Sequence, residues 1–125
     1  MRQETADYLA KARECLNRAQ ATLPLPAVAA REAYLAGYHA AEAWITERSG
    51  KPVKTHRGVR GRFGRLAKDE PRIDAEFTRF LVSGYRFKEI ADCGTGPEAV
   101  VTAAEAAEAI ETAARFVECI AGLLE

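Results

Sequence analysis

Residues 30–45 read AREAYLAGYHAAEAWI, and their apolar side chains recur at steps of three and four residues. Two neighbouring rows share this apolar face: Tyr34, Tyr38, Ala41 and Ile45 form one, and Ala33, Gly37, Ala40 and Trp44 form the other. This spacing is typical of a helix, and a face this broad indicates packing against at least two other helices. With the stop signal Ser49-Gly50, the pattern predicts a central helix over residues 27–48.

Four long helices are predicted in all. Their apolar side chains repeat at steps of three or four, and prolines or glycines stand between them. The last helix begins at a capping box formed by Thr102 and Glu105. No segment alternates with a period of two, so no sheet is expected. The long helices are predicted over residues 4–22, 27–48, 71–92 and 103–124.

The connection over residues 56–68 is ambiguous. It contains Gly58, Gly61 and Gly64, each of which costs up to about 1 kcal/mol against Ala inside a helix. Three apolar residues keep helical spacing all the same: Val59, Phe63 and Leu66. A short, weak helix whose glycines permit close backbone approach is predicted, and a flexible loop is the alternative. The predicted fold is all-α, an antiparallel bundle of four long helices plus one short helix, in a single domain of residues 1–125.

Charge is unevenly distributed, although the 125 residues sum to a formal net charge of zero. Residues 51–68, here called the basic segment, contain seven Lys or Arg and no Asp or Glu, whereas residues 97–125 contain six Glu against Arg115 alone. Lys and Arg supply the sequence-independent part of nucleic-acid affinity, so the basic segment could bind phosphates. Alternatively, it could pair with the acidic last helix, within the chain or across a dimer.

Several classes of site are disfavoured by what the sequence lacks. The three cysteines, Cys15, Cys93 and Cys119, are odd in number and form no C-x-x-C, which argues against a disulfide scaffold or a zinc site. Two histidines cannot form a histidine-rich metal site, and no phosphate-binding glycine loop is present. There is no membrane-spanning apolar stretch and no signal-peptide core. We therefore expect a cytoplasmic protein with no metal, cofactor or membrane partner.

Three polar residues are candidates for chemistry: His56, Lys88 and Asp92. Neighbouring cations favour the neutral form of His56, which suits hydrogen bonding or a general base; helix capping or plain solvation is the alternative. Lys88 and Asp92 lie one turn apart, in the order less favourable to a helix, and border the core stripe. They form either a site or a structural ion pair. His39 is expected on the polar side of its helix, facing solvent or an interface.

Residues 30–45 resemble the second helix of HEPN domains (higher eukaryote and prokaryote nucleotide-binding), with a small residue and Arg, an aromatic region, and then A-x-[aromatic]-H-A-A. Residues 55–59, THRGV, with residues 63–66, FGRL, resemble the short helix of that family and its leading His. Residues 88–93, KEIADC, resemble its R-x-x-A-D-Y, and a last helix like residues 102–124 is also typical. The resemblance spans nearly the whole chain in order.

The resemblance implies a bundle of four or five helices, commonly dimeric, of the kind found in bacterial toxin–antitoxin pairs beside a minimal nucleotidyltransferase. Many HEPN toxins are metal-independent RNases that carry R-x(4–6)-H. Here Ala91, Asp92 and Cys93 stand where that His would follow Arg86, and Lys88 stands where close relatives have Arg. The first hypothesis is therefore a non-catalytic module that dimerises and binds a nucleotidyltransferase-like partner, nucleotide or RNA.

A divergent metal-independent endoribonuclease is the second hypothesis. Its candidate catalytic residues are Lys88, which would stabilise a phosphate, and Asp92 or His56, which would transfer a proton. The residues expected to bind ligand or RNA are Lys54, Arg57, Arg60, Tyr34, Tyr38 and His39. A plain assembly protein, in which the basic segment of one subunit meets the last helix of another, is the third hypothesis.

Overall fold

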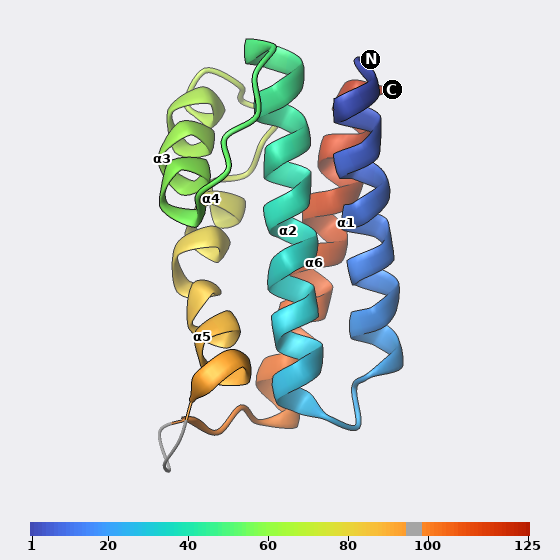
Figure 1. The fold of residues 1–125 in the computed structure, drawn as a ribbon, viewed down its shortest axis with the longest axis vertical. Coiled ribbons are helices and arrows are strands. Elements are labelled where there is room, and N and C mark those ends of the chain that lie inside the picture. Colours follow the sequence, from blue (N-terminus) through green and yellow to red (C-terminus); the bar gives the residue numbers. More distant parts are fainter. Residues whose placement is uncertain (95–98) are drawn as a thin grey trace.

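The computed structural model describes residues 1–94 and 99–125 as a bundle of helices (Figure 1). No strand occurs among these residues, so the predicted all-α helical bundle is confirmed. The helices are α1 (Gln3–Ala21), α2 (Pro26–Ser49), α3 (His56–Ala67), α4 (Ala75–Ser83), α5 (Tyr85–Cys93) and α6 (Ala103–Leu124). No helix in this described part is long and apolar enough to cross a membrane.

The long elements alternate in direction, whereas the short helix α3 does not. Figure 1 shows α1, α2, the α4–α5 pair and α6 running up and down in turn along the long axis. The connection over residues 50–55 runs back along α3 before that helix begins, so α3 points the same way as α2. The first residue of α3 therefore lies beside the middle of α2 and not at the end of the bundle.

The prediction of one helix over residues 71–92 is wrong at its start. The helix α4 begins at Ala75, because the Asp74 carboxylate accepts a hydrogen bond from the Glu76 backbone N–H at 2.8 Å and so caps it. Pro71 lies in the preceding turn, and the buried Ile73 anchors that turn to the core.

The same prediction is also wrong in its middle, where the helix breaks between α4 and α5. The Ser83 hydroxyl donates to the Arg79 carbonyl at 3.0 Å, a bond that bends helices. A Cβ at Gly84 would lie 2.6 Å from the Phe80 carbonyl oxygen and 3.1 Å from the Tyr34 ring. Only glycine fits this junction without a shift, and the junction brings α5 close to α2.

Residues 56–67 form a regular helix, so the flexible-loop alternative is wrong. Two of its residues face the core: Val59 and Phe63. The predicted close backbone approach is not found at Gly58, although side chains pack tightly there: a Cβ would lie 2.6 Å from a methyl carbon of Val53. Nor is it found at Gly61 or Gly64, where the nearest atom would be 3.5 Å away.

The helix α2 is central, as its broad apolar face predicts. Fourteen of its 24 residues are buried, and it contacts α1, α3, α4, α5 and α6. Gly37 lies at a close-packed point of the core: a Cβ there would meet the Phe80 ring at 3.0 Å and the Phe116 ring at 3.1 Å. Phe116 in turn stacks on Phe77 with ring centroids 4.8 Å apart.

We expect Gly37→Ala to destabilise the fold by about 1–3 kcal/mol, because the added methyl overpacks two aromatic rings in a close-packed core. Gly122→Ala is the matched control: nothing lies within 4 Å of its Cβ position, and Ala is the better helix former. Urea unfolding followed by circular dichroism measures both. Equal stability of the two variants would contradict this account of the core.

Candidate functional site

His56 is the first residue of α3, but it does not cap that helix. The Thr55 side chain does so, accepting a hydrogen bond from the Gly58 backbone N–H at 3.0 Å. The capping alternative for His56 is therefore wrong. Because Thr55 satisfies the helix end, the imidazole of His56 is free to pack against its neighbours.

The ring of His56 lies among three tyrosines from two other helices. Its Nδ1 lies 2.8 Å from the Tyr34 hydroxyl, and the ring stacks on Tyr38 with centroids 4.2 Å apart. The ring of Tyr85, the first residue of α5, lies 5.2 Å away. We call His56 with Tyr34, Tyr38 and Tyr85 the aromatic cluster. It joins α2, α3 and α5 at one place, so plain solvation of His56 is also wrong.

The surroundings favour the neutral forms of His56, Tyr34 and Tyr38. Burial lowers the pKa of His56 below its ordinary value of 6.5, and the charges of Lys88 and Arg60 lower it further. The predicted preference for neutral imidazole is confirmed, although burial contributes more than the cations do. Burial also raises the pKa of Tyr34, and with the charge of Glu42 it raises the pKa of Tyr38 to about 12. The Tyr34 hydroxyl therefore stays protonated beside Nδ1 of His56.

Lys88 and Asp92 form an ion pair, and a third residue completes it. Lys88 Nζ donates to Asp92 Oδ2 at 2.8 Å, while Arg31 Nε, from α2, donates to Oδ1 at 2.8 Å. The bond from Lys88 and the charge of Arg31 lower the pKa of Asp92. The structural ion pair is thus present, and it lies beside His56, whose pKa responds to both charges.

Arg31 is the site residue that sequence reasoning missed. It lies one turn before Tyr34 on α2 and is the Arg of the family pattern in residues 30–45, and both signals could have pointed to it. Nothing in the sequence showed that the end of α5 returns to this turn, because the break at Gly84 sets the path of α5.

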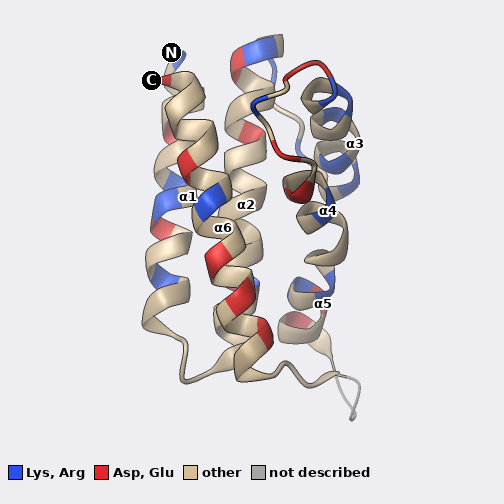
Figure 2. Ribbon diagram, turned by 180° about the vertical axis from the view of Figure 1, so that it is seen from behind, with Lys and Arg blue, Asp and Glu red and all other residues tan. Residues whose placement is uncertain are grey.

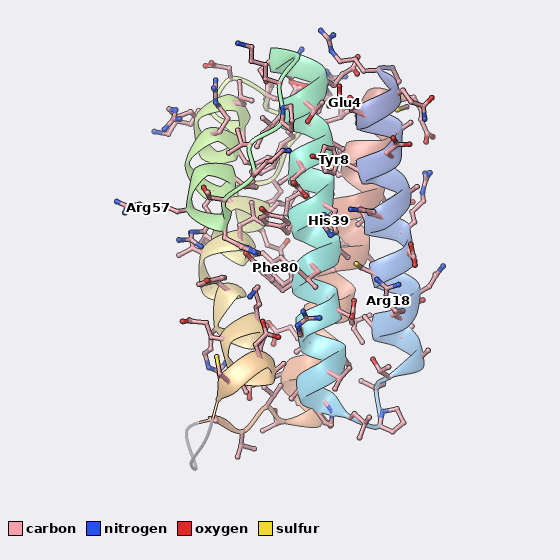
Figure 3. All side chains as sticks on the ribbon, viewed as in Figure 1. Glu4, Tyr8, Arg18, His39, Arg57 and Phe80 are labelled. Atoms are coloured by element: carbon pink, nitrogen blue, oxygen red, sulfur yellow. The ribbon has the colours of Figure 1, made fainter. Side chains whose placement is uncertain are left out.

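The cations of the basic segment are largely unpaired. Six of them are exposed and form no ion pair within the described part of the chain: Lys51, Lys54, Arg57, Arg62, Arg65 and Lys68. They follow α3 and the connection before it (Figure 2), and Arg57 projects away from the bundle (Figure 3). Arg60 instead turns inward, with its guanidinium carbon 5.0 Å from the centre of the Tyr85 ring and its Nη1 buried without a hydrogen-bond partner.

The acidic helix α6 does not neutralise the basic segment within the chain. Its described ion pairs go to other cations: Glu105 to Arg86, Glu111 to Arg115, and Glu125 to Arg13. The intrachain alternative for the basic segment is therefore wrong for the residues that the structure describes. Pairing across a dimer stays a hypothesis.

His39 lies at the edge of the aromatic cluster. Its Nδ1 is 2.6 Å from Glu42 Oε1, and its ring meets Tyr38 edge to face at 5.5 Å. The side of α2 that was predicted to be polar is instead mostly buried: Glu42 is 5% exposed and Ala36 and Ala43 are inaccessible. The helix α1 packs against this side of α2. Tyr8 of α1 lies near Glu42, and burial together with the charge of Glu42 raises the pKa of Tyr8.

The site offers exposed cations and two partly exposed rings, the neutral imidazole of His56 and the ring of Tyr85. Tyr34 and Tyr38 are 0% and 5% exposed and present no open ring face. The cations and the two partly exposed rings suit a ligand with phosphates and bases, since cations bind phosphate and ring faces accept bases. No group of three or more potential metal ligands occurs among the described residues.

Fold and site together define a small helical bundle that presents cations beside stacked aromatic rings. The family model for the HEPN domain matches residues 5–123. The chain therefore belongs to the HEPN domain family, whose members generally have functions that involve nucleotides or RNA. No curated protein matches the chain.

We expect Lys88→Gln to raise the pKa of His56 toward its ordinary value, because it removes a nearby positive charge and frees the negative charge of Asp92. Titration of the His56 ring protons by NMR measures this shift. Lys11→Gln, an exposed change on α1, is the control and should leave the titration unchanged. An unaltered His56 pKa in Lys88→Gln would show that Lys88 does not face the imidazole.

Because the pKa of His56 is lowered in the folded protein, its stability depends on pH. The unfolded chain binds the proton more readily, so the stability contributed by neutral His56 is present above about pH 6.5 and is lost as the pH falls through the folded-state value. We expect the wild type to lose more stability than His56→Gln between about pH 8 and about pH 5. Thermal melts of both proteins test this, since their carboxylates are the same.

Proposed function

We propose that this chain is a non-catalytic HEPN-type module that binds RNA or a nucleotide through the aromatic cluster and the basic segment. The observation that supports it is the row of exposed cations that flanks His56 in the chain, Lys54 and Arg57 among them, which form no ion pair with the residues that the structure describes. The row continues along the 12 residues of α3, which is about 18 Å. This length favours RNA, which presents several phosphates, over a single nucleotide.

Each candidate catalytic residue already takes part in a hydrogen bond, which supports a module without catalytic activity. Both carboxylate oxygens of Asp92 accept hydrogen bonds from cations, and Lys88 donates to one of them. Nδ1 of His56 is engaged by the Tyr34 hydroxyl. The family's R-x(4–6)-H is absent after Arg86. A proton-transfer role for Asp92 would need one of its contacts to break, whereas Nε2 of His56 forms no hydrogen bond with the described residues.

A divergent metal-independent endoribonuclease is the second candidate. One observation favours it: neutral His56 lies within reach of the charge of Lys88, which is the combination of a base and a phosphate-stabilising cation. Cleavage of RNA by the purified protein that is lost in both Lys88→Ala and His56→Phe would establish this candidate and overturn the non-catalytic one. His56→Phe keeps a ring in the aromatic cluster, so a loss would reflect chemistry and not misfolding.

We also propose the setting that the family resemblance implies, namely a homodimer within a toxin–antitoxin-like system that binds a minimal nucleotidyltransferase. It is supported by an intact helical framework without the ribonuclease His. Copurification with the product of a neighbouring nucleotidyltransferase gene tests the partner, and light scattering tests the dimer. A dimer that persists at high salt would contradict an interface made only of the basic segment and α6, because exposed charge pairs are screened.

We expect Lys54→Ala and Arg57→Ala each to weaken RNA binding. Each should also reduce the salt dependence of the affinity, by roughly 0.7 in log–log slope for every RNA phosphate that the variant no longer neutralises. Fluorescence anisotropy with a short labelled oligouridylate measures both quantities across salt concentrations. Lys11→Ala, which removes an exposed cation from α1, is the control and should leave both unchanged. Equal reductions in all three variants would show that the binding is not located at the basic segment.

A further inference from the structure

Asp92 is held by two cations that come from different helices. Arg31 of α2 and Lys88 of α5 each donate to one oxygen of its carboxylate at 2.8 Å. The three side chains are only partly exposed, at 33% for Arg31, 27% for Lys88 and 34% for Asp92. Both cations therefore meet at Asp92, and these three side chains carry a net charge of about +1. A second carboxylate, that of Glu32, has its Oε1 3.5 Å from Arg31 Nη1 and is shared with Arg18.

The position of Asp92 is not explained by the stability of α5. It is the next-to-last residue of that helix, where the helix dipole disfavours a negative charge. Its pairing with Lys88 also has the order that contributes less to helix stability. A carboxylate at a position that the helix dipole and the pair order both disfavour is expected where a binding site requires it.

We propose that Arg31 and Lys88 form a phosphate subsite and that Asp92 is its internal anion, displaced when the phosphate binds. The proposal rests on the proposed RNA-binding function and specifies where one phosphate sits. A phosphate presents oxygens that accept from a guanidinium and an ammonium in the same way as the carboxylate does. The phosphate takes the place of the Asp92 carboxylate on both cations, while Arg31 keeps its second carboxylate, Glu32.

The subsite lies next to the aromatic cluster. Tyr85, one turn before Lys88 on α5, contacts the His56 ring at 5.2 Å, and the charge of Lys88 lowers the pKa of His56. A nucleotide bound here would place its phosphate on Arg31 and Lys88 while its base lies toward the tyrosine and histidine rings. The phosphate could be a terminal monoester or a backbone diester, which share this chemistry.

Anisotropy with a 3′-labelled oligouridylate, with either a 5′-phosphate or a 5′-hydroxyl, tests the subsite. We expect Asp92→Asn to tighten binding by about three- to tenfold, because the internal competitor is removed, and Arg31→Ala and Lys88→Ala to weaken it by a similar factor. An effect confined to the 5′-phosphate form identifies the terminal monoester, and an equal effect on both forms identifies the diester. The matched controls are Arg86→Ala and Glu105→Gln, which break the α5–α6 ion pair of the same kind and should leave binding unchanged.

Inorganic phosphate provides a second measurement that does not depend on RNA binding. Phosphate should raise the melting temperature of Asp92→Asn more than that of Glu105→Gln, since a ligand that binds the folded state stabilises it. Equal shifts in these two variants would overturn the subsite. RNA binding that is abolished in Arg57→Ala but unaltered in Arg31→Ala, Lys88→Ala and Asp92→Asn would overturn the subsite alone and leave the proposed function standing. If no variant binds RNA, the proposed function fails, and the phosphate shifts still decide the subsite.

Discussion

The contact of His56 with two tyrosines of α2 is the interaction on which the rest of the site depends. The imidazole stacks on Tyr38 at 4.2 Å, and its Nδ1 meets the Tyr34 hydroxyl at 2.8 Å. This contact fixes the start of α3 against the middle of α2. It can form only because the connection over residues 50–55 runs back along α3, and because Thr55 caps the helix in place of the histidine.

Two kinds of cation result from this arrangement. Arg31, Lys88 and Arg60 lie inside or beside the aromatic cluster, where they meet a carboxylate or a ring. The exposed cations of the basic segment meet no carboxylate within the described chain. Burial, together with the charges of Lys88 and Arg60, lowers the pKa of His56, whereas the outer cations leave a positive surface beside it. A net charge of zero for the chain therefore conceals a strongly local positive field.

The sequence predicted those features that depend on local chemistry. The helical periodicity of α1, α2 and α6, the capping box at Thr102 and the stop at Gly50 all appear as expected, since each is encoded within a few residues. The neutral preference of His56 also followed from neighbouring charges. The break at Gly84 was missed because apolar side chains keep helical spacing through α4 and α5, although the adjacent Ser83 and Gly84 are residues at which helices kink.

Features that depend on how helices meet could not be predicted. Arg31 was missed because its partner Asp92 lies 61 residues away, and Glu42 was placed on a polar side that α1 in fact covers. Whether the basic segment pairs with α6 was left open for the same reason. Only the arrangement of the helices shows that Glu105 and Glu111 of α6 pair with other cations.

The central claim is that the meeting point of α2, α3 and α5 binds RNA, and mapping of backbone amide NMR shifts during titration with a short oligouridylate tests it most directly. The account predicts shifts that cluster around Arg31, His56 and Lys88 and are absent from the α1–α6 side. Shifts confined to the α1–α6 side, or no saturable shifts at low salt, would contradict it.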